Sequence, residues 1–357
     1  MVRAITVEPG VAGSARLEQV AAPESAPNAL LVEAVALGIC GTDREIVAGK
    51  YGWAPPGRKR LILGHESLAR VVEAPDRSGF DAGDLVVPIV RMPDPVPCAN
   101  CAAGEWDMCS NGKYTEHGIK SLDGFGTERF RVPTDRVVRL EPSLDRLGVL
   151  LEPTSVVAKA WEHTERIGQR ATWRPRIALV TGAGPIGLLA ALLGVQRGLE
   201  VHVLDRATAG PKPGVVRALG ATYHSENIAD LELDADVVME CTGAAPVVAD
   251  VLTRTRRNGI VCLTGVSSGG RRVPLDIGAV NREMVLENDV VFGSVNANRR
   301  HYEAAAKALA QADSHWLSSL ITRRVSLDHW ADALQPHPDD IKVVVEFGTA
   351  DSSRRSG

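Results

Sequence analysis

The stretch Thr181-Gly182-Ala183-Gly184-Pro185-Ile186-Gly187 separates an apolar run at 177–180 from an Ala/Leu-rich run at 186–196. It has the G-x-G-x-x-G spacing of a strand–turn–helix loop that binds a dinucleotide pyrophosphate. Gly182 permits the tight turn, Gly184 lets the main chain approach the phosphates, and Gly187 lets the helix pack closely on the strand. The phosphates then meet the positive end of the helix dipole. The alternative interpretation is an ordinary glycine-rich turn with no ligand. The candidate cofactor-binding residues are Gly182, Gly184, Pro185, Ile186 and Gly187.

Strand-like and helical segments alternate around this loop. Strands are expected at 177–180, 201–205, 237–240 and 260–263, and helices at 186–196, 214–219 and 246–255. This alternation predicts parallel βαβ units in a doubly wound sheet, and we assign residues 175–295 to a Rossmann domain. The uncharged segment 177–196 is long enough to cross a bilayer, but its glycines and proline divide it into a strand and a helix.

The region before residue 175 has a different pattern of apolar runs and turns. Short β-like runs at 30–36, 68–72, 85–90 and 136–140 lie between Gly and Pro turns. This pattern predicts a β-rich domain over residues 1–174. From about residue 295 the alternation stops, and a helix at 302–311 and a strand at 342–347 follow. The fold class is therefore α/β, with a β-rich domain and a doubly wound domain.

The composition excludes several classes of protein. The 357 residues are 45% hydrophobic, 24% charged and 4% aromatic, with a formal net charge of −4. These values exclude disordered and fibrous classes, and they give no basic or aromatic surface for nucleic acid. No apolar export segment begins the chain, and six unevenly spaced cysteines are too sparse for a disulfide scaffold. We expect a cytoplasmic enzyme or small-molecule binder with no membrane or nucleic-acid partner.

Asp205 ends the second strand of the doubly wound region, 18 positions after Gly187. A carboxylate there accepts hydrogen bonds from the adenosine ribose hydroxyls and repels a 2′-phosphate. The position favours NAD, with Asp205 and Arg206 as cofactor-binding residues. Arg206 and Lys212 could instead attract a 2′-phosphate, so NADP stays the alternative.

Two groups of residues have metal-ligand chemistry. Cys40 ends one apolar run, and His65 and Glu66 follow another. Thiolate, imidazole and carboxylate form a tetrahedral zinc set with one open position, although Cys40 and His65 could also be ordinary core residues. Glu152, in an apolar run, needs a partner if it is buried, and a metal or a substrate hydroxyl could supply one.

Cys98, Cys101 and Cys109 form the second group. Three thiolates at this spacing suggest a closed structural zinc, which requires a fourth ligand. Asp94 lies nearby and could supply that ligand. The alternative is a metal-free loop held by its own prolines.

These features, in this order, resemble the zinc-dependent medium-chain dehydrogenases/reductases along nearly the whole chain. Within that family the chain is most similar to the archaeal-type glucose dehydrogenases. The segments that carry this resemblance are Leu63-Gly64-His65-Glu66, Val87-Pro88-Ile89-Val90-Arg91, Leu151-Glu152-Pro153, Arg282-Glu283-Met284-Val285-Leu286 and Gly293-Ser294-Val295-Asn296.

The resemblance implies a GroES-like catalytic domain that is interrupted by the Rossmann domain and resumes at 296–357. It implies a catalytic zinc on Cys40, His65 and Glu66, with Glu152 on the metal or bridging metal and sugar. Thr42 would contact the reacting oxygen, and Glu116 and Asn296 would bind sugar hydroxyls. The implied reaction is hydride transfer from C1 of an aldose, most simply glucose, to NAD(P), giving a lactone. A homodimer or homotetramer is implied too, with the strand at 290–295 as a candidate contact.

The chain departs from the family pattern at three places. Pro95 stands where the structural lobe has its first cysteine, Asp205-Arg206 favours NAD, and Glu287 replaces a histidine near the sugar. Glu287 and Arg91 therefore raise a second hypothesis, a dehydrogenase of another polyol, cyclitol or amino sugar. A third hypothesis is a non-catalytic dinucleotide-binding sensor, for which an open zinc site has no physical use.

Overall fold

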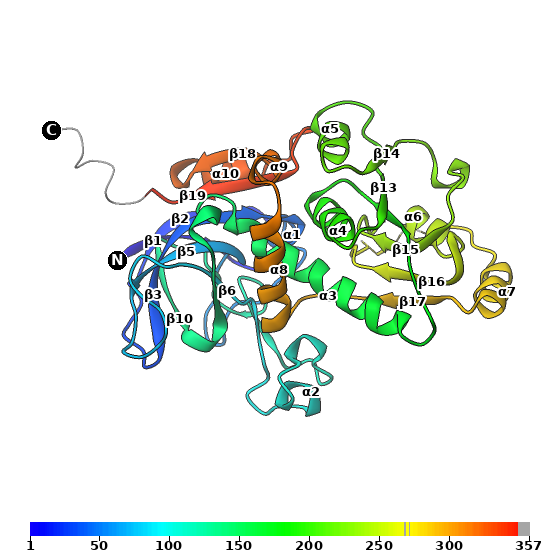
Figure 1. Cartoon of the computed structure of the whole chain (residues 1–357). Coiled ribbons are helices and arrows are strands. Elements are labelled where there is room, and N and C mark those ends of the chain that lie inside the picture. Colours follow the sequence, from blue (N-terminus) through cyan, green and yellow to red (C-terminus); the bar gives the residue numbers. More distant parts are fainter. Residues whose placement is uncertain (268, 271, 349–357) are drawn as a thin grey trace. The chain divides into compact units, whose positions relative to one another are not determined.

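The computed structural model describes residues 1–267, 269–270 and 272–348, and these form two compact units. The first unit contains Met1–Glu152, Ala297–Gln311 and the chain from Ile321 onward, and the second contains Pro153–Asn296 and Ala312–Leu320. Figure 1 follows the chain through both units. The final part of the expected segment 296–357, from residue 349, lies outside the described residues.

The first unit is β-rich, as predicted, and its largest sheet is seven-stranded. The sheet has the order β11-β6-β5-β3-β19-β18, with β10 also paired to β3. Its core combines residues from the start of the chain, such as Leu30 and Leu37, with Val343 and Val345 near the end. The strands of this unit are β1 (Val2–Val7), β2 (Arg16–Val20), β3 (Ala29–Ile39), β4 (Leu61–Ile62), β5 (Glu66–Glu73), β6 (Leu85–Pro88), β7 (Arg91–Met92), β8 (Thr115–His117), β9 (Ser121–Leu122), β10 (Arg129–Pro133), β11 (Val137–Arg139), β18 (Ile321–Ser326) and β19 (Lys342–Glu346). Its helices are α1 (Gly41–Val47), α2 (Ala99–Ala102), α8 (Arg299–Gln311) and α10 (Trp330–Leu334).

The second unit contains a six-stranded parallel sheet in the order β14-β13-β12-β15-β16-β17. This order is that of a doubly wound dinucleotide-binding fold, whose ligands bind beyond the carboxyl ends of the central strands. Its strands are β12 (Ile177–Thr181), β13 (Glu200–Leu204), β14 (Thr222–His224), β15 (Ala235–Glu240), β16 (Thr255–Leu263) and β17 (Val290–Gly293). Its helices are α4 (Pro185–Gln196), α5 (Pro211–Ala218), α6 (Ala245–Val251), α7 (Ile277–Glu287) and α9 (Ser314–Leu320), with most of α3 (Leu151–Gly168).

The unit boundaries differ from the expected 174 and 295. Helix α3 belongs mainly to the second unit, because Trp161 lies in its core and donates a hydrogen bond to the Ala190 carbonyl of α4 at 3.1 Å. The segment 312–320 also joins this unit, where the Trp316 indole donates to the Val215 carbonyl of α5 at 2.9 Å. The first strand of the doubly wound sheet does begin close to residue 175, at Ile177.

One helix was predicted too long. The expected helix at 246–255 ends at Val251, and Thr255 already begins β16. Thr255 of β16 pairs with Ala235 of β15, so the sheet includes the last residue of the expected helix. Among the described residues, no helix has both the length and the apolar character needed to cross a membrane.

Candidate active site

Cys40, His65 and Glu66 meet where β3 ends and β5 begins. Cys40 directly follows β3, and Glu66 is the first residue of β5. The two strands are antiparallel, with Gly38 opposite Glu66, so the end of one lies beside the start of the other. One ligand atom from each of the three residues lies within 4.8 Å of the other two. Cys40 Sγ lies 3.2 Å from His65 Nε2.

Asp43, in the first turn of α1, orients the His65 ring. Its Oδ2 accepts a hydrogen bond from the Cys40 backbone N–H at 2.9 Å, and its Oδ1 lies 3.5 Å from His65 Nδ1. With a carboxylate beside Nδ1, the ring directs Nε2 at Cys40. Metal-binding histidines are usually supported in this way, by a carboxylate at the ring nitrogen that does not bind the metal. Burial lowers the pKa of His65, but the charges of Cys40 and Asp43 raise it well above its ordinary value. Sequence analysis did not assign this orienting role to Asp43.

These residues fit a catalytic zinc. His65 and Glu66 are buried, and the Asp43 carboxylate 3.5 Å from His65 Nδ1 leaves Nε2 beside Cys40 Sγ. A thiolate, an imidazole and a carboxylate together are a donor set that zinc accepts, and three protein ligands leave a fourth position for substrate.

Glu152 and Thr42 lie in the same unit. Glu152, the second residue of α3, is buried, but it is not part of the group of three. Burial raises the pKa of Glu152 to about 7, with His65 opposing the shift and Glu66 reinforcing it. Thr42 is half-buried in the first turn of α1, two residues after Cys40.

Lys342, at the start of β19, is a site neighbour that sequence analysis missed. Its ammonium is 1% exposed and donates to both carboxylate oxygens of Glu66, at 2.8 and 2.5 Å. Burial lowers the pKa of Lys342, but Glu66 and Cys40 raise it more, so the net pKa lies above its ordinary value. The only sequence signal is one lysine heading the apolar run of a strand.

The glycine loop has the geometry that its spacing predicts. Gly182 has a φ of 93°, in the left-handed region that the turn requires. Gly184 precedes Pro185, the first residue of α4, and no protein atom lies within 4 Å of a Cβ built on it. A Cβ on Gly187 would overlap the Gly182 carbonyl oxygen, so the helix packs directly on the turn. Gly184, Pro185 and Ile186 are all partly exposed.

Asp205 lies directly after β13 and is bonded to the glycine loop. Its carboxylate accepts hydrogen bonds from the Ala183 N–H at 2.7 Å, the Ala207 N–H at 3.0 Å and the Lys212 ammonium at 3.2 Å. Burial raises the pKa of Asp205, but these donors outweigh it and lower the net value. The carboxylate is therefore ionised beside the loop. Arg206 is exposed.

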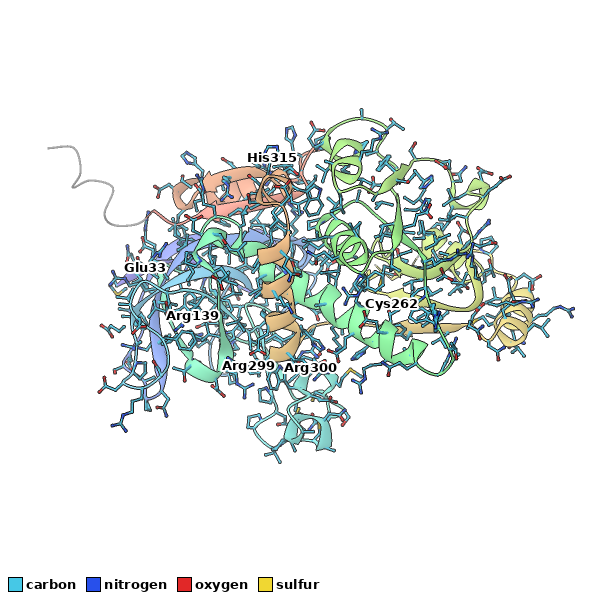
Figure 2. The ribbon with its side chains drawn as sticks, in the orientation of Figure 1. Glu33, Arg139, Cys262, Arg299, Arg300 and His315 are labelled. Atoms are coloured by element: carbon cyan, nitrogen blue, oxygen red, sulfur yellow. The ribbon has the colours of Figure 1, made fainter. Side chains whose placement is uncertain are left out.

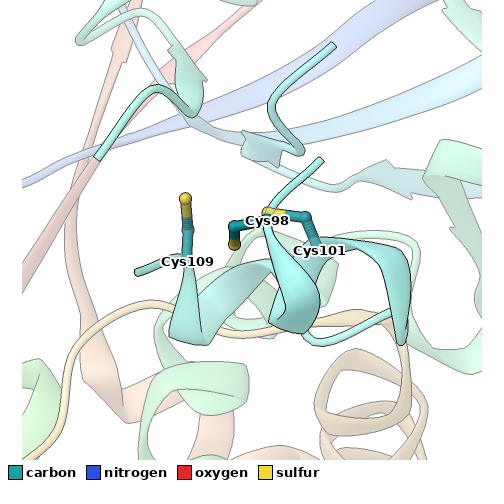
Figure 3. Close-up of side chains that lie close together, drawn as sticks. All are labelled: Cys98, Cys101 and Cys109. Atoms are coloured by element: carbon teal, nitrogen blue, oxygen red, sulfur yellow. The ribbon is translucent and has the colours of Figure 1, made fainter. Parts of the chain in front are cut away.

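The structure brings Cys98, Cys101 and Cys109 together on the lobe around α2, with one sulfur from each within 4.8 Å of the others. Figure 3 shows the three side chains gathered on one side of the lobe. Hydrogen bonds, chiefly from Ser110, lower the pKa of Cys98 to about 5, whereas burial raises the pKa of Cys101 to about 11. Asp94 is not in this group, because its carboxylate accepts bonds from Asn111 and from the Val96 N–H at 3.0 Å.

The expected sugar-binding residues lie in different units. Glu116, on β8, is buried and paired with Arg91 at 2.9 Å. Asn296, in the second unit, lies in the loop that follows β17 and has a φ of 61°. Glu287 ends α7 and pairs with Arg257 of β16 at 2.6 Å.

Two family models match the chain. The model described as the alcohol dehydrogenase GroES-like domain matches residues 26–142, and the one described as the glucose dehydrogenase C-terminus matches residues 145–347. The second match covers more than half of the chain, and the first falls within the unit that holds Cys40 and His65.

Curated relatives agree with these matches. The chain is 38% identical to a glucose 1-dehydrogenase of Methanocella arvoryzae, over 97% of this chain and 99% of the relative. It is 40% identical to glucose 1-dehydrogenase 1 of Caldivirga maquilingensis, with the same coverage. The solved structure of Haloferax mediterranei glucose dehydrogenase in complex with NADP, Zn and gluconolactone is 33% identical over 97% of this chain and 99% of that one, with a TM-score of 0.90. The chain therefore belongs to the glucose dehydrogenase family of zinc-dependent medium-chain dehydrogenases.

Proposed function

We propose that this protein oxidises glucose at C1 with NAD or NADP as hydride acceptor and releases a lactone. The observation that carries the proposal is the convergence of Cys40, His65 and Glu66 in a chain 38–40% identical to glucose 1-dehydrogenases. When bound, a zinc ion supplies a Lewis acid that lowers the pKa of a substrate hydroxyl, and the nicotinamide supplies the redox chemistry.

The residues of this chain have separate tasks in that reaction. Cys40, His65 and Glu66 hold the ion, and Asp43 fixes the ring of His65 through Nδ1. Thr42 would hydrogen-bond the reacting oxygen and pass its proton outward, with Asp43 or Glu152 as the acceptor. Glu152 supplies a buried carboxyl for the ion or for a sugar hydroxyl, and Glu116 and Asn296 bind other hydroxyls of the sugar.

A substrate panel tests this function. The purified protein, given glucose with NAD and separately with NADP, should form reduced nicotinamide and gluconolactone. The same assay with glucosamine, inositol and sorbitol covers the alternative substrates. Robust turnover of one of these without glucose turnover would replace the substrate, and cofactor binding without any turnover would favour a non-catalytic sensor. The Glu287 carboxylate is already paired with Arg257, so it is not available to pair with the ammonium group of an amino sugar.

We also propose that NAD is preferred, because Asp205 places an ionised carboxylate beside the glycine loop. Asp205→Ser should raise kcat/KM for NADP relative to NAD by about tenfold or more, which corresponds to about 1.4 kcal/mol. The change removes repulsion of the 2′-phosphate and releases the Lys212 ammonium to bind it. Initial rates with both cofactors measure this ratio. Asp205→Ser combined with Lys212→Met should lose most of the gain, whereas an unchanged ratio in Asp205→Ser alone would contradict the assignment.

A second, structural zinc is proposed on Cys98, Cys101 and Cys109, supported by the grouping of their sulfurs. Its fourth ligand would be Asp94 or another group, and Asp94 would have to leave Asn111 to bind it. We expect the wild-type protein to contain about two zinc ions per chain and Cys101→Ser to contain about one. Elemental analysis after gel filtration gives these ratios. A wild-type content of one ion, retained in Cys101→Ser, would show that the lobe is metal-free.

The protein is further proposed to work in the cytoplasm as a homodimer or homotetramer. The assembly proposal is supported by β17, an edge strand of its sheet, and by exposed apolar residues Ile277, Val285 and Leu286 on the adjacent α7. The cytoplasmic assignment is supported by six free cysteines, of which Cys262 on β16 is labelled in Figure 2. Light scattering should give a mass of two or four chains.

A further inference from the structure

Tyr51 and Trp53 are the only exposed aromatic side chains in the part of the chain that the structure describes. Their exposed fractions are 42% and 49%, whereas the other aromatic residues there are buried or half-buried. The two rings lie edge to face, with their centroids 5.1 Å apart and an interplanar angle of 73°. Single exposed apolar residues need no explanation, but two in contact, in a chain with only 4% aromatic residues, mark a candidate binding surface.

The backbone holds this aromatic pair beside the turn that carries Glu116. The Trp53 N–H donates to the Ile119 carbonyl, and the Trp53 carbonyl accepts from the Ser121 N–H, both at 2.9 Å. Between those two residues, the Lys120 carbonyl accepts a hydrogen bond from the Glu116 N–H at 2.9 Å. One short segment is therefore bonded to Trp53 on one edge and to Glu116 on the other.

The same turn packs against the candidate active site. A Cβ built on Gly118 would overlap the carbonyl oxygen of Gly64, so the turn directly contacts the residue before His65. Burial raises the pKa of Tyr51, and the charge of Glu116 adds to the shift, so the phenol lies close enough to feel that carboxylate. Because Glu116 is buried and both rings are exposed, the aromatic pair lies on the solvent side of the site.

An aromatic surface beside a carboxylate suits a sugar ring. The axial C–H groups of a pyranose pack on aromatic faces, while a phenol O–H or an indole N–H can bond its hydroxyls. In the proposed reaction, C1 of glucose is held at the metal and Glu116 binds another hydroxyl of the same ring. Since C4 lies across the ring from C1, a substituent on O4 points away from the metal.

We propose that Tyr51 and Trp53 form an outer subsite for a second sugar ring, through which the protein also oxidises 4-O-linked disaccharides at their reducing-end glucose. This inference rests on the proposed oxidation of glucose. The C1–H hydride passes to the nicotinamide, the C1 hydroxyl releases its proton, and C1 becomes the lactone carbonyl while the glycosidic bond stays intact. The aromatic pair touches no reacting atom, so its two residues determine specificity.

Kinetics with cellobiose and glucose test the subsite. Wild type should oxidise both sugars, and Trp53→Ala should lower kcat/KM for cellobiose about tenfold while that for glucose stays within about twofold. The loss should appear in KM, because stacking on the second ring is the same in the ground state and the transition state. Trp53→Phe, which keeps an aromatic face, should recover most of the loss. Trp173→Ala is the matched control, because Trp173 is also partly exposed but packs on Gly168 in the second unit.

A binding measurement separates the subsite from turnover. Methyl β-cellobioside and methyl β-glucoside both lack a free C1 hydroxyl, so neither can be oxidised. By calorimetric titration of the zinc-loaded protein, the cellobioside should bind wild type about tenfold more tightly than the glucoside. Trp53→Ala should bind the two glycosides with equal affinity.

The outcomes distinguish this inference from the proposed function. Glucose turnover without cellobiose turnover would overturn the outer subsite and leave the proposed function intact. Equal losses for both sugars in Trp53→Ala would also overturn it, because the indole would then contact the glucose ring or support the fold. Absence of turnover with either sugar would contradict the proposed function as well. A loss confined to the disaccharide, with the matching loss of cellobioside affinity, supports the outer subsite.

Discussion

Cys40→Ala is expected to lose one zinc ion per chain and to lower kcat/KM for glucose by about three orders of magnitude. Cys40 Sγ lies 3.2 Å from His65 Nε2, so the substitution removes one of the three proposed zinc ligands. Lewis-acid stabilisation by a metal is worth several kcal/mol, and about 4 kcal/mol corresponds to this factor in rate. Zinc analysis and initial rates with saturating cofactor measure the two effects.

Cys262→Ala is the matched control for this prediction. Cys262 is a fully buried thiol on β16, in the other unit, so its loss removes a similar volume without touching the ligand set. It should keep both zinc and glucose turnover close to wild type. Wild-type turnover in Cys40→Ala after exhaustive chelation would contradict the proposed chemistry, whatever the control does.

Gly187→Ala is expected to destabilise the second unit by about 1–3 kcal/mol and to weaken cofactor binding sharply. The new Cβ would overlap the Gly182 carbonyl oxygen, so α4 and the turn cannot keep their present distance. The displaced helix would carry its N-terminal N–H groups away from the pyrophosphate. Thermal unfolding with and without NAD, together with titration of reduced-cofactor fluorescence, measures both losses.

Gly184→Ala separates cofactor contact from folding. Because no protein atom lies within 4 Å of a Cβ at Gly184, the free protein should unfold within about 0.5 kcal/mol of wild type. Its affinity for NAD should still fall, since the methyl group occupies space that the pyrophosphate needs. Equal cofactor affinity in Gly184→Ala and wild type would mean that the phosphates bind elsewhere.

The doubly wound domain could be predicted from sequence because its signals are local. The strand ending at Thr181, the glycine spacing and the helix at 185–196 each specify the same βα unit within a few residues. The helix expected at 246–255 was predicted too long because the end of this segment is not set by a local signal. Pairing with β15 is a contact between distant segments, and it overrides the helical pattern of the preceding residues.

The candidate active site was only partly predictable. Cys40 and His65 are 25 residues apart, and only the pairing of β3 with β5 brings them together; the family resemblance anticipated this. Asp43 lies only three residues after Cys40, but its position beside His65 Nδ1 depends on the turn into α1. Lys342 is 276 residues from Glu66, and no local pattern in its strand marks it as a partner.

The most direct test of the proposed chemistry is a crystal structure of the zinc-loaded protein, with diffraction recorded at the zinc absorption edge. We expect an anomalous peak about 2.3 Å from Cys40 Sγ and about 2.0–2.1 Å from His65 Nε2, the usual zinc–ligand distances. A fully loaded protein without a peak between these two atoms, or with zinc only at Cys98, Cys101 and Cys109, would contradict it.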